Sequence, residues 1–254
     1  MGAEASSAGP GADRLGPVTN TLTRRTALGG VAGSVAVMAA RLSGTGLSVD
    51  PGPYGSGLNA HWANFSPSLS TDATFSTAPV WMFGDSVAEV CQFYLATQLW
   101  AQRAQTLAVN NWPARPTQPA VDALVTALGR FPAPRQIIMA SGPNDIFDPP
   151  QMAGQIDRAM SAAGSIPVFW MEVQVCRTQG TFQIADQRNT GWVNQQIHEA
   201  TGRWPALHVV PWFVSLASAP GRLTAYLGSD GVHPNSLGVA FYTAVVLQAL
   251  PPLH

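Results

Sequence analysis

Residues able to perform nucleophilic catalysis lie in three short motifs of the 254-residue chain, two of them directly after apolar segments and the third before the last helical segment. A Gly-Asp-Ser triplet ends at Ser86, where a stretch with helical spacing begins. Asp230 and His233 stand three residues apart on a glycine-containing loop near the C-terminus. An aspartate at that spacing can hold Nδ1 of the imidazole and fix the tautomer whose Nε2 faces a nucleophile. Asn144, after another apolar segment, adds a side-chain amide to these candidates.

Each of these residues could instead have an ordinary structural role. In an isolated Gly-Asp-Ser triplet, Ser86 or Asp85 more often caps the following helix. His233 alone could equally cap a helix or face solvent. A serine at a helix N-terminus, however, has its backbone N–H available in positive potential, which suits it to hold a developing oxyanion. The three loops together favour a catalytic interpretation, and we expect Asp85 and Asp145 to support loop geometry by accepting backbone hydrogen bonds.

The composition excludes several other kinds of chemistry. All 13 basic side chains are arginine, so a P-loop, a lysine Schiff base and a Ser-Lys dyad are ruled out. The net charge of −1 provides no basic surface for a polyanion, and we do not expect nucleic acid as a partner. Two cysteines about 85 residues apart cannot build a cysteine-based structural zinc site. The proposed chemistry needs no metal and no cofactor.

Apolar runs of strand length alternate with helical segments after residue 79. The runs are continuous, which predicts strands buried on both faces, and they lie at 80–84, 106–110, 136–141, 167–173 and 207–212. The helical segments are expected at Ser86 to Arg103, Thr117 to Leu128, Gln151 to Ala163, Ala185 to Thr201 and Ser236 to Leu250. This alternation predicts an α/β fold with a parallel sheet between helices. Ligands of such sheets bind beyond the carboxyl ends of the strands, where the three loops lie.

The order of the motifs resembles the SGNH or GDSL hydrolase family. G-D-S follows the first strand, G-x-N-D follows the third, and D-G-x-H-P precedes the last helix. The resemblance covers most of residues 79–250. It implies a flavodoxin-like three-layer α/β/α sandwich with a five-stranded parallel sheet in the order 2-1-3-4-5. It also implies acyl transfer from an ester to water or to another hydroxyl.

The resemblance assigns roles to residues of this chain. Ser86 would be the nucleophile, His233 the general base and Asp230 its orienting carboxylate. The Ser86 backbone N–H and the Asn144 side-chain amide would hold the oxyanion. No metal takes part in such a site.

A third oxyanion donor is expected in the loop after the second strand. The family has a glycine there, whereas residues 110–115 contain none. Ala114 is the best placed, because it keeps the backbone N–H that Pro113 lacks. Losing one oxyanion donor typically costs about 10²- to 10³-fold in turnover.

Three residues near the predicted strand ends are candidates for substrate binding: Arg115, Trp112 and Glu172. An indole could stack on a sugar ring or line an acyl pocket, although a buried tryptophan is more often part of the core. Arg115 and Glu172 could contact a polar substrate, although such charges more often have structural or surface roles. The remaining histidines show no partner pattern and are interpreted as structural or exposed: His61, His198, His208 and His254.

The first 45 residues resemble an export segment. Thr26 to Ala40 is uncharged and follows Arg24-Arg25, and it is too short for a confident membrane span of about 20 residues. The sequence from Thr23 to Leu28 resembles the twin-arginine export motif, with an alanine where phenylalanine is commoner. An amphipathic helix or an uncleaved anchor is the alternative. We expect an extracytoplasmic protein, secreted or in the cell envelope, with no stable membrane span after processing.

Two further regions complete the expected organisation. Residues 46–78 are rich in Gly, Ser, Pro and Thr and predict a flexible leader, and residues 79–254 form the hydrolase domain. Outside the reducing cytosol, Cys91 and Cys176 could form a disulfide. Two buried thiols without such a bond are the alternative.

The leading functional expectation is an exported serine esterase or acylhydrolase acting on a small-molecule, lipid or glycan ester. With the same triad, the chain could instead be an O-acyl- or O-acetyltransferase, or a deacetylase, acting on a cell-envelope glycan. A non-catalytic module that binds glycan or lipid is the second alternative.

Overall fold

The structure is a computed structural model that describes residues 62–178, 183–219 and 221–253. The predicted export segment of residues 1–45 and the leader up to residue 61 lie outside these ranges. Within them, no helix combines the length and apolar character needed to cross a membrane.

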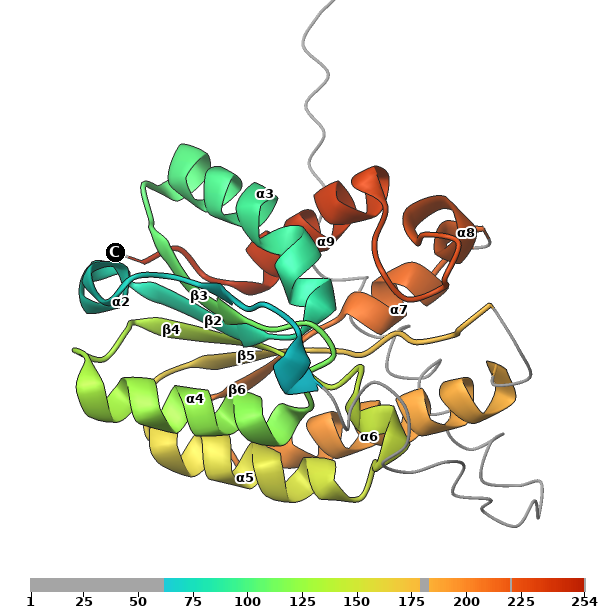
Figure 1. The fold of residues 1–254 in the computed structure, drawn as a ribbon, viewed down its shortest axis with the longest axis horizontal. Coiled ribbons are helices and arrows are strands. Elements are labelled where there is room, and N and C mark those ends of the chain that lie inside the picture. The colour runs from blue at the N-terminus through green and yellow to red at the C-terminus, as the bar shows by residue number, and fades with distance from the viewer. Residues whose placement is uncertain (1–61, 179–182, 220, 254) are drawn as a thin grey trace, which may run out of the picture.

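Five parallel strands form the centre of the fold (Figure 1). They are β2 (Val80–Gly84), β3 (Leu107–Asn111), β4 (Gln136–Ala140), β5 (Val168–Met171) and β6 (Leu207–Val210). Their hydrogen-bonded order, β3-β2-β4-β5-β6, confirms the predicted order 2-1-3-4-5. The register pairs Gly84 with Asn111 on one side and with Ala140 on the other. The carboxyl ends of β2, β3 and β4 are therefore level at one edge of the sheet.

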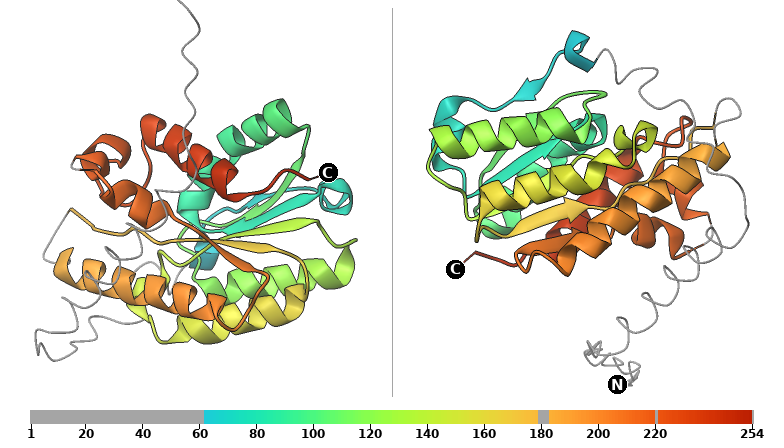
Figure 2. Two further views of the ribbon diagram at one scale, coloured as in Figure 1. Left: turned by 180° about the vertical axis from the view of Figure 1, so that it is seen from behind. Right: turned by 90° about the horizontal axis from the view of Figure 1, so that it is seen from below.

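Helices cover both faces of this sheet and complete the predicted three layers (Figures 1 and 2). One face carries α3 (Ser86–Arg103), α7 (Trp212–Ala217), α8 (Arg222–Tyr226) and α9 (Ser236–Ala249). The other carries α4 (Thr117–Arg130), α5 (Gln151–Ala163) and α6 (Gln183–Thr201). The short elements α7, α8 and the 3₁₀ turn η2 (Asp145–Phe147) were not predicted, because one or two turns are too few to show helical periodicity.

The strand β2 shows why its apolar run is continuous. Trp81 and Phe83 belong to the hydrophobic cluster on one face of the sheet, whereas Val80 and Met82 belong to the cluster on the other. All four side chains are fully buried. Because successive residues of a strand point to opposite faces, burial of both faces requires every position to be apolar.

A short strand and a helix precede β2, in part of the segment expected to be a flexible leader. Strand β1 (Ser68–Leu69) pairs antiparallel with β3 and adds a sixth strand at the sheet edge. Helix α2 (Asp72–Thr77) buries Phe75, whose ring packs edge-on against Trp81 at a centroid distance of 5.2 Å. Residues 68–77 are thus ordered against the domain. The expectation of a flexible leader is corrected for this part, because one buried aromatic and a paired edge outweigh its polar composition.

Candidate active site

Ser86, His233 and Asp230 meet beyond the carboxyl ends of the strands. Nε2 of His233 lies 2.8 Å from Oγ of Ser86, and its Nδ1 lies 2.6 Å from Oδ2 of Asp230. The structure therefore brings together the three residues that the sequence placed in one triad. A hydroxyl, an imidazole and a carboxylate in this line can pass a proton from the hydroxyl to the imidazole.

The junction between β2 and α3 places Ser86 at the helix N-terminus. Asp85 caps the helix, since its carboxylate accepts the Val87 N–H at 3.0 Å. A Cβ on Gly84 would lie only 2.3 Å from Cβ of Ala88, so no larger residue fits at this position. As the first residue of the helix, Ser86 has a backbone N–H without an intrahelical acceptor. The Ser86 hydroxyl and the Ser86 backbone N–H therefore both lie beyond the carboxyl end of β2.

The loop carrying Asp230 and His233 is held by its own hydrogen bonds. Oδ1 of Asp230 accepts the backbone N–H groups of Val232 at 2.9 Å and His233 at 3.0 Å. Gly231 has a positive φ of 74°, and a Cβ there would lie 2.0 Å from the carbonyl oxygen of Cys176. Partial burial opposes ionisation of Asp230, but the hydrogen bonds from the His233 side chain and the two N–H groups lower its pKa overall. Asp230 is therefore suited to remain an anionic partner of the imidazole.

Asn144, the expected oxyanion donor, lies at the same edge and contacts protein acceptors. Its Nδ2 is 3.2 Å from Oδ2 of Asp85 and 3.2 Å from the carbonyl oxygen of Arg115. Both contacts are longer than the usual 2.9–3.0 Å of an N–H···O bond. An oxyanion beside Ser86 would compete with these two acceptors for the amide protons.

Ala114 occupies a turn directly after β3. The Arg115 N–H donates to the Trp112 carbonyl at 3.2 Å, and Ala114 between them has a φ of +59°. Pro113 followed by a positive φ is typical of a type II turn, in which glycine is favoured at the position that Ala114 fills. The backbone thus adopts here the conformation that a glycine would take. Within the described ranges, the Ala114 N–H donates to no backbone carbonyl.

Two buried carboxylates support these loops, as the sequence predicted. Asp85 is fully buried, and Asp145, at 6% exposure, accepts the backbone N–H of Thr117 at 3.0 Å and its hydroxyl at 2.7 Å. Burial raises the pKa of Asp85 to about 7, with a further upward contribution from Asp145. Burial likewise raises the pKa of Asp145 to about 7. Both groups therefore titrate near neutral pH.

Arg115, predicted to contact substrate, is instead a structural residue, and that prediction is corrected. Only 2% of the residue is exposed. Its guanidinium donates to the Gly84 carbonyl at 2.7 Å and to Oδ1 of Asn110 at 2.6 Å. Burial lowers its pKa to about 10. The buried side chain connects the Ala114 turn to the end of β2.

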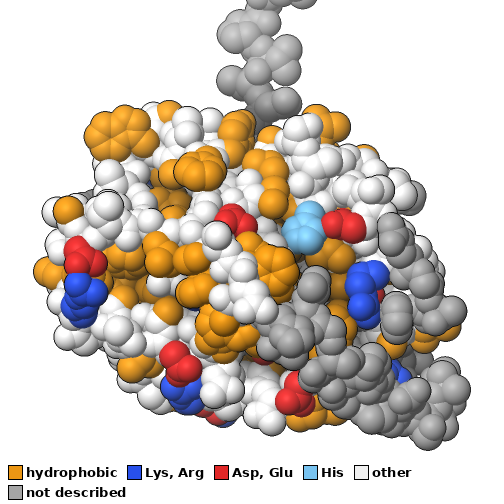
Figure 3. All heavy atoms as spheres, in the orientation of Figure 1, with side chains coloured by type: hydrophobic (Ala, Val, Ile, Leu, Met, Phe, Trp, Pro, Cys, Tyr) orange, Lys and Arg blue, Asp and Glu red, His pale blue; other side chains and the backbone are white. Residues whose placement is uncertain are grey.

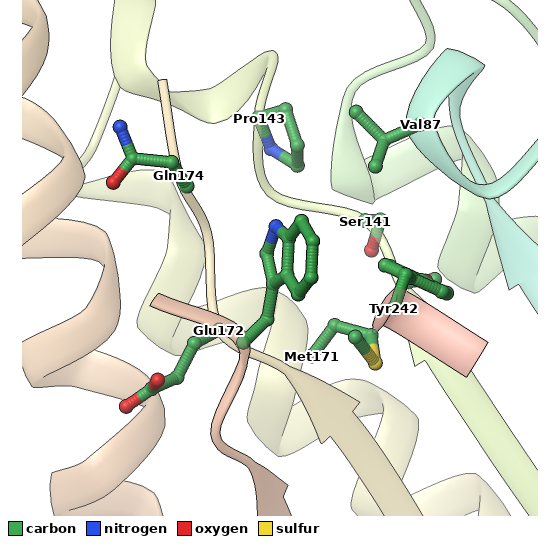
Figure 4. Close-up of a pocket in the computed structure, with 9 residues that line it drawn as sticks. Val87, Ser141, Pro143, Met171, Glu172, Gln174 and Tyr242 are labelled. Atoms are coloured by element: carbon green, nitrogen blue, oxygen red, sulfur yellow. The ribbon is translucent and has the colours of Figure 1, made fainter. Parts of the chain in front are cut away.

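Glu172 is corrected in the same way. It is 2% exposed, and its carboxylate accepts the Val214 N–H at 2.9 Å and lies 2.7 Å from Nε2 of His198. Figure 4 shows the Glu172 side chain directed away from the pocket that its backbone helps to line. His198, interpreted as structural or exposed, therefore makes a structural contact to Glu172 that no sequence pattern indicated.

Trp112 is the predicted binding residue that keeps exposed surface at the site. It is half-buried, and its indole N–H donates to the Phe65 carbonyl at 2.6 Å. The Trp62 ring meets it edge-on at a centroid distance of 4.9 Å. Trp112 precedes Ala114 by two residues, so an aromatic surface borders the expected oxyanion site. Figure 3 shows this face of the molecule, on which an exposed histidine and an acidic side chain lie among hydrophobic groups.

A small pocket lies between the ends of β4 and β5 and helix α9 (Figure 4). It has room for about one water-sized group. Tyr242 lines it with a buried hydroxyl that has no hydrogen-bond partner among the described residues. The lining residues are Val87, Ala140, Ser141, Pro143, Met171, Glu172, Gln174, Trp212 and Tyr242. Its nearest link to the triad is Val87, which follows Ser86 in the chain.

The described ranges contain no group of three or more His, Cys, Asp or Glu side chains that could hold a metal ion. Both cysteines are free thiols in the structure. Cys91 is buried in the core on α3, and Cys176 is half-buried in the loop after β5.

One set of buried polar residues near the site was not predicted from the sequence. Asp186, Asn189, Thr190 and Asn194 of α6 are polar yet buried, and their side chains bond to the loops that follow β4 and β5. The detectable signal is their spacing: 186, 190 and 194 recur every four residues on one helix face. Polar residues on a helix face are usually interpreted as solvent-exposed, and so this pattern was missed.

No protein-family model matches the sequence, and no curated protein sequence does. Solved structures match it in fold. A lipase/acylhydrolase from Enterococcus faecalis is 16% identical over 69% of this chain and 98% of its own, with a TM-score of 0.52. The C-terminal catalytic domain of peptidoglycan O-acetyltransferase A from Streptococcus pneumoniae is 18% identical over 68% and 92%, with a TM-score of 0.53. A GDSL-like lipase from Bacteroides thetaiotaomicron is 13% identical over 72% and 90%, with a TM-score of 0.56. Likeness at these identities concerns the fold.

Proposed function

Because the chain has the fold of the SGNH/GDSL hydrolases, we propose that it is an acyl-transfer enzyme that cleaves a carboxylic ester. The observation that carries the proposal is the line of contacts through His233, which lies 2.8 Å from the Ser86 hydroxyl and 2.6 Å from the Asp230 carboxylate. Neither contact alone would distinguish a catalytic histidine from a structural one. A polarised hydroxyl at a helix N-terminus, with a base and an orienting carboxylate behind it, is suited to nucleophilic attack.

The reaction follows from this geometry in two stages. Oγ of Ser86 attacks the ester carbonyl carbon while Nε2 of His233 takes its proton, and Asp230 stabilises the imidazolium. The N–H groups of Ser86 and Ala114 and the amide of Asn144 hold the oxyanion. Collapse of the tetrahedral intermediate breaks the ester C–O bond, and the alcohol leaves with the proton from His233. Water then attacks the acyl-enzyme, giving up a proton to His233, and the free acid is released as Ser86 regains its proton.

A specific observation favours a second candidate with the same triad. One structural neighbour is the catalytic domain of a peptidoglycan O-acetyltransferase. Transfer of an acetyl group to a glycan hydroxyl, or its removal from one, differs from simple ester cleavage only in which acceptor or ester enters the site. The half-exposed Trp112 and its neighbour Trp62 offer an aromatic surface of the kind that stacks on sugar rings.

The test of enzymatic activity compares Ser86→Ala with a matched serine variant. The purified chain is assayed on p-nitrophenyl esters from acetyl to long acyl chains, beside Ser86→Ala and Ser161→Ala. Ser161 is exposed on α5, and its hydroxyl donates to the Asp157 carbonyl of the same helix. We expect turnover to fall about 10⁴-fold or more in Ser86→Ala and to be unchanged in Ser161→Ala. Equal rates in wild type and Ser86→Ala would refute the enzymatic proposal and favour a non-catalytic glycan- or lipid-binding module.

Labelling and acceptor partition separate the remaining candidates. A sulfonyl fluoride should modify Ser86, as mass spectrometry of the peptide would show; the streptococcal neighbour was solved with a methylsulfonyl adduct. Preference for acetyl esters favours deacetylation or acetyl transfer, and preference for long chains favours a lipase. A third assay supplies a chito-oligosaccharide as acceptor together with an acetyl ester. Formation of acetylated chito-oligosaccharide would favour acetyl transfer over hydrolysis.

The location of the enzyme is a separate proposal, supported by Arg24-Arg25 ahead of an apolar stretch. Replacing this pair by Lys-Lys should retain the chain in the cytoplasm, whereas Arg41→Lys should not. Undiminished export of the Lys-Lys variant would refute the twin-arginine route. The proposed substrate is then an ester or glycan met outside the cytoplasm.

A further inference from the structure

An extended segment after β5, residues 173–178, lies between α6 and the loop that carries the acid and base of the triad. We call it the bridging segment. Figure 1 shows the chain leaving β5 and continuing along α6. In an extended chain, the backbone groups of successive residues point to opposite sides. One edge of the bridging segment can therefore bond to α6 while the other bonds to the triad loop.

Two side chains of α6 hold the first half of the bridging segment. Asn194 accepts the Val173 N–H at 2.7 Å and donates its amide to the Val173 carbonyl at 2.9 Å. Four residues earlier on the helix, Thr190 donates its hydroxyl to the Val175 carbonyl at 3.2 Å. These contacts replace the neighbouring strand that an edge of this kind would otherwise need.

Asp186, one helical turn before Thr190, holds the next odd-numbered residue. Its carboxylate accepts the backbone N–H of Arg177 at 2.9 Å and the guanidinium of Arg177 at 2.9 and 2.7 Å. Asp186 is 2% exposed, Thr190 1% and Asn194 5%. Since burial of polar groups is costly unless they are hydrogen-bonded, these directional bonds define where the bridging segment lies.

Two even-numbered residues, Cys176 and Thr178, bond to the triad loop on the other side. The Cys176 N–H donates to the Gly231 carbonyl at 3.2 Å, and the Thr178 N–H donates to the Asp230 carbonyl at 3.2 Å. The Thr178 hydroxyl donates to the Ser229 carbonyl. The bridging segment thus forms hydrogen bonds to the backbone carbonyls of Asp230 and of the residue on either side of it.

We infer that Asp186, Thr190 and Asn194 are positioning residues that set the geometry of the Asp230–His233 pair through the bridging segment. Thr190 and Asp186 bond to Val175 and Arg177, whose chain neighbours Cys176 and Thr178 bond to Gly231 and Asp230. Asn194 acts from further away, because it fixes Val173 at the start of the same segment. The inference rests on the proposed catalytic roles of Asp230 and His233. A small displacement of a general base or its orienting group is enough to slow turnover, because the reacting atoms must stay aligned.

The kinetic test uses two variants of the buried Thr190, one without its hydroxyl and one that keeps it. Thr190→Val removes the hydroxyl that bonds to the bridging segment, and Thr190→Ser keeps it. The matched control is Thr243→Val, because Thr243 is 2% exposed and its hydroxyl has no hydrogen-bond partner in the described structure. We expect kcat to fall about 10-fold in Thr190→Val, with KM unchanged, and to stay at the wild-type value in the other two. An unchanged kcat in Thr190→Val would overturn the inference.

A double-mutant cycle distinguishes positioning from general damage. Asn194→Leu should lower kcat about 10- to 100-fold in the wild-type background. In an Asp230→Asn background the same change should cost less than about twofold, because coupled residues are not additive. Equal losses in both backgrounds would show that Asn194 does not act through Asp230. Thermal unfolding of each variant verifies that the chain is folded.

Proton NMR tests the geometry without any substrate. The proton between Nδ1 of His233 and Asp230 should give a downfield signal, because that hydrogen bond is short at 2.6 Å. We expect this signal to shift in Asn194→Leu and Thr190→Val and to stay in place in Thr243→Val. A shifted signal in a chain that cleaves no ester would refute the proposed function and support the positioning role. An unshifted signal in a chain that cleaves esters would support the proposed function and refute the positioning role.

Discussion

The two halves of the candidate active site are built in different ways. On the triad side, Ser86, His233 and Asp230 contact one another directly at 2.8 and 2.6 Å. On the oxyanion side, the Asn144 amide lies 3.2 Å from each of two protein acceptors, and Ala114 lies in a turn with a positive φ. In the proposed mechanism, the triad residues already make the contacts that proton transfer needs, whereas the Asn144 amide would have to exchange a contact to protein for one to substrate.

Burial of charge also separates the two halves. The side chains of His233 and Asp230 are 38% and 48% exposed, so solvent screens them in part. The oxyanion side is backed by Asp85 and Arg115, which are 0% and 2% exposed. Partly exposed, charge-assisted hydrogen bonds define the triad side. The oxyanion side contains the buried ionisable groups of Asp85 and Arg115. Because burial raises the pKa of Asp85 to about 7, the charge on this side changes near neutral pH.

The largest expected effect is on the triad side. Asp230→Asn should lower kcat about 10⁴-fold, because the amide favours the wrong imidazole tautomer. Asp122→Asn, at an exposed residue of α4, is the control. Steady-state kinetics on a p-nitrophenyl ester gives the comparison. A loss below about tenfold would mean that the contact at 2.6 Å is structural.

A smaller effect is expected from the oxyanion side. Asn144→Ala should lower kcat about 10²- to 10³-fold, the usual cost of one oxyanion donor. KM should change little, since the amide is needed most in the transition state. The comparison between the halves would fail if Asn144→Ala cost as much as Asp230→Asn. A loss below about threefold would remove Asn144 from the mechanism.

The buried carboxylates predict how stability depends on pH. Burial raises the pKa of Asp85 from 3.8 to about 7 in the folded state, so between pH 4 and 7 the unfolded chain loses this proton first. Stability should therefore fall as pH rises through this window and level off above pH 7. Each kcal/mol lost lowers Tm by about 2–4 °C.

Asp85→Asn should weaken this dependence, and Asp145, whose pKa is also raised to about 7, should account for the remaining slope. Calorimetry of both proteins from pH 5 to 8 measures the effect. Identical slopes in wild type and Asp85→Asn would show that this carboxylate does not titrate in the window.

The smallest effect concerns the turn itself. Ala114→Gly should stabilise the fold by about 1 kcal/mol, because an alanine at φ +59° is strained and a glycine is not. Turnover should change less than about twofold, since the N–H is retained. The matched control is Ala104→Gly, at φ +51° on the far end of α3. Urea denaturation should give similar gains for both, and a loss of activity confined to Ala114→Gly would show that the methyl group contacts substrate.

Local sequence carried much of the fold and of the triad. Each central strand is a continuous apolar run, so its burial on both faces could be predicted from the sequence. Ser86 directly follows such a run, Asp230 and His233 lie in a short motif before the last helix, and the fold brings the two loops together at one edge of the sheet. The elements missed were those without a period, such as α2, whose place depends on Phe75 finding Trp81.

The structure favours structural roles for Arg115 and Glu172, and the partners that decide this include residues distant in the sequence. From the sequence, Arg115 resembles a substrate contact, but in the structure its guanidinium donates to the carbonyl of Gly84, 31 residues earlier. Glu172 resembles a free carboxylate until His198 and Val214 engage it. A charged residue beside a strand end has the same local sequence in either role, so only its burial distinguishes them.

The sequence by itself determined that Ser86 would directly follow an apolar strand of a parallel sheet and that Asp230 and His233 would share one short loop before the last helix, because each motif is contiguous in the chain. Only the tertiary structure decided that Asn144 is shared between two acceptors, that Ala114 adopts a glycine-like turn, and that the polar face of α6 is buried against residues 173–178. Those features depend on contacts between segments far apart in the chain. Such contacts are selected by packing and by the need to satisfy buried hydrogen bonds, and no local pattern records them.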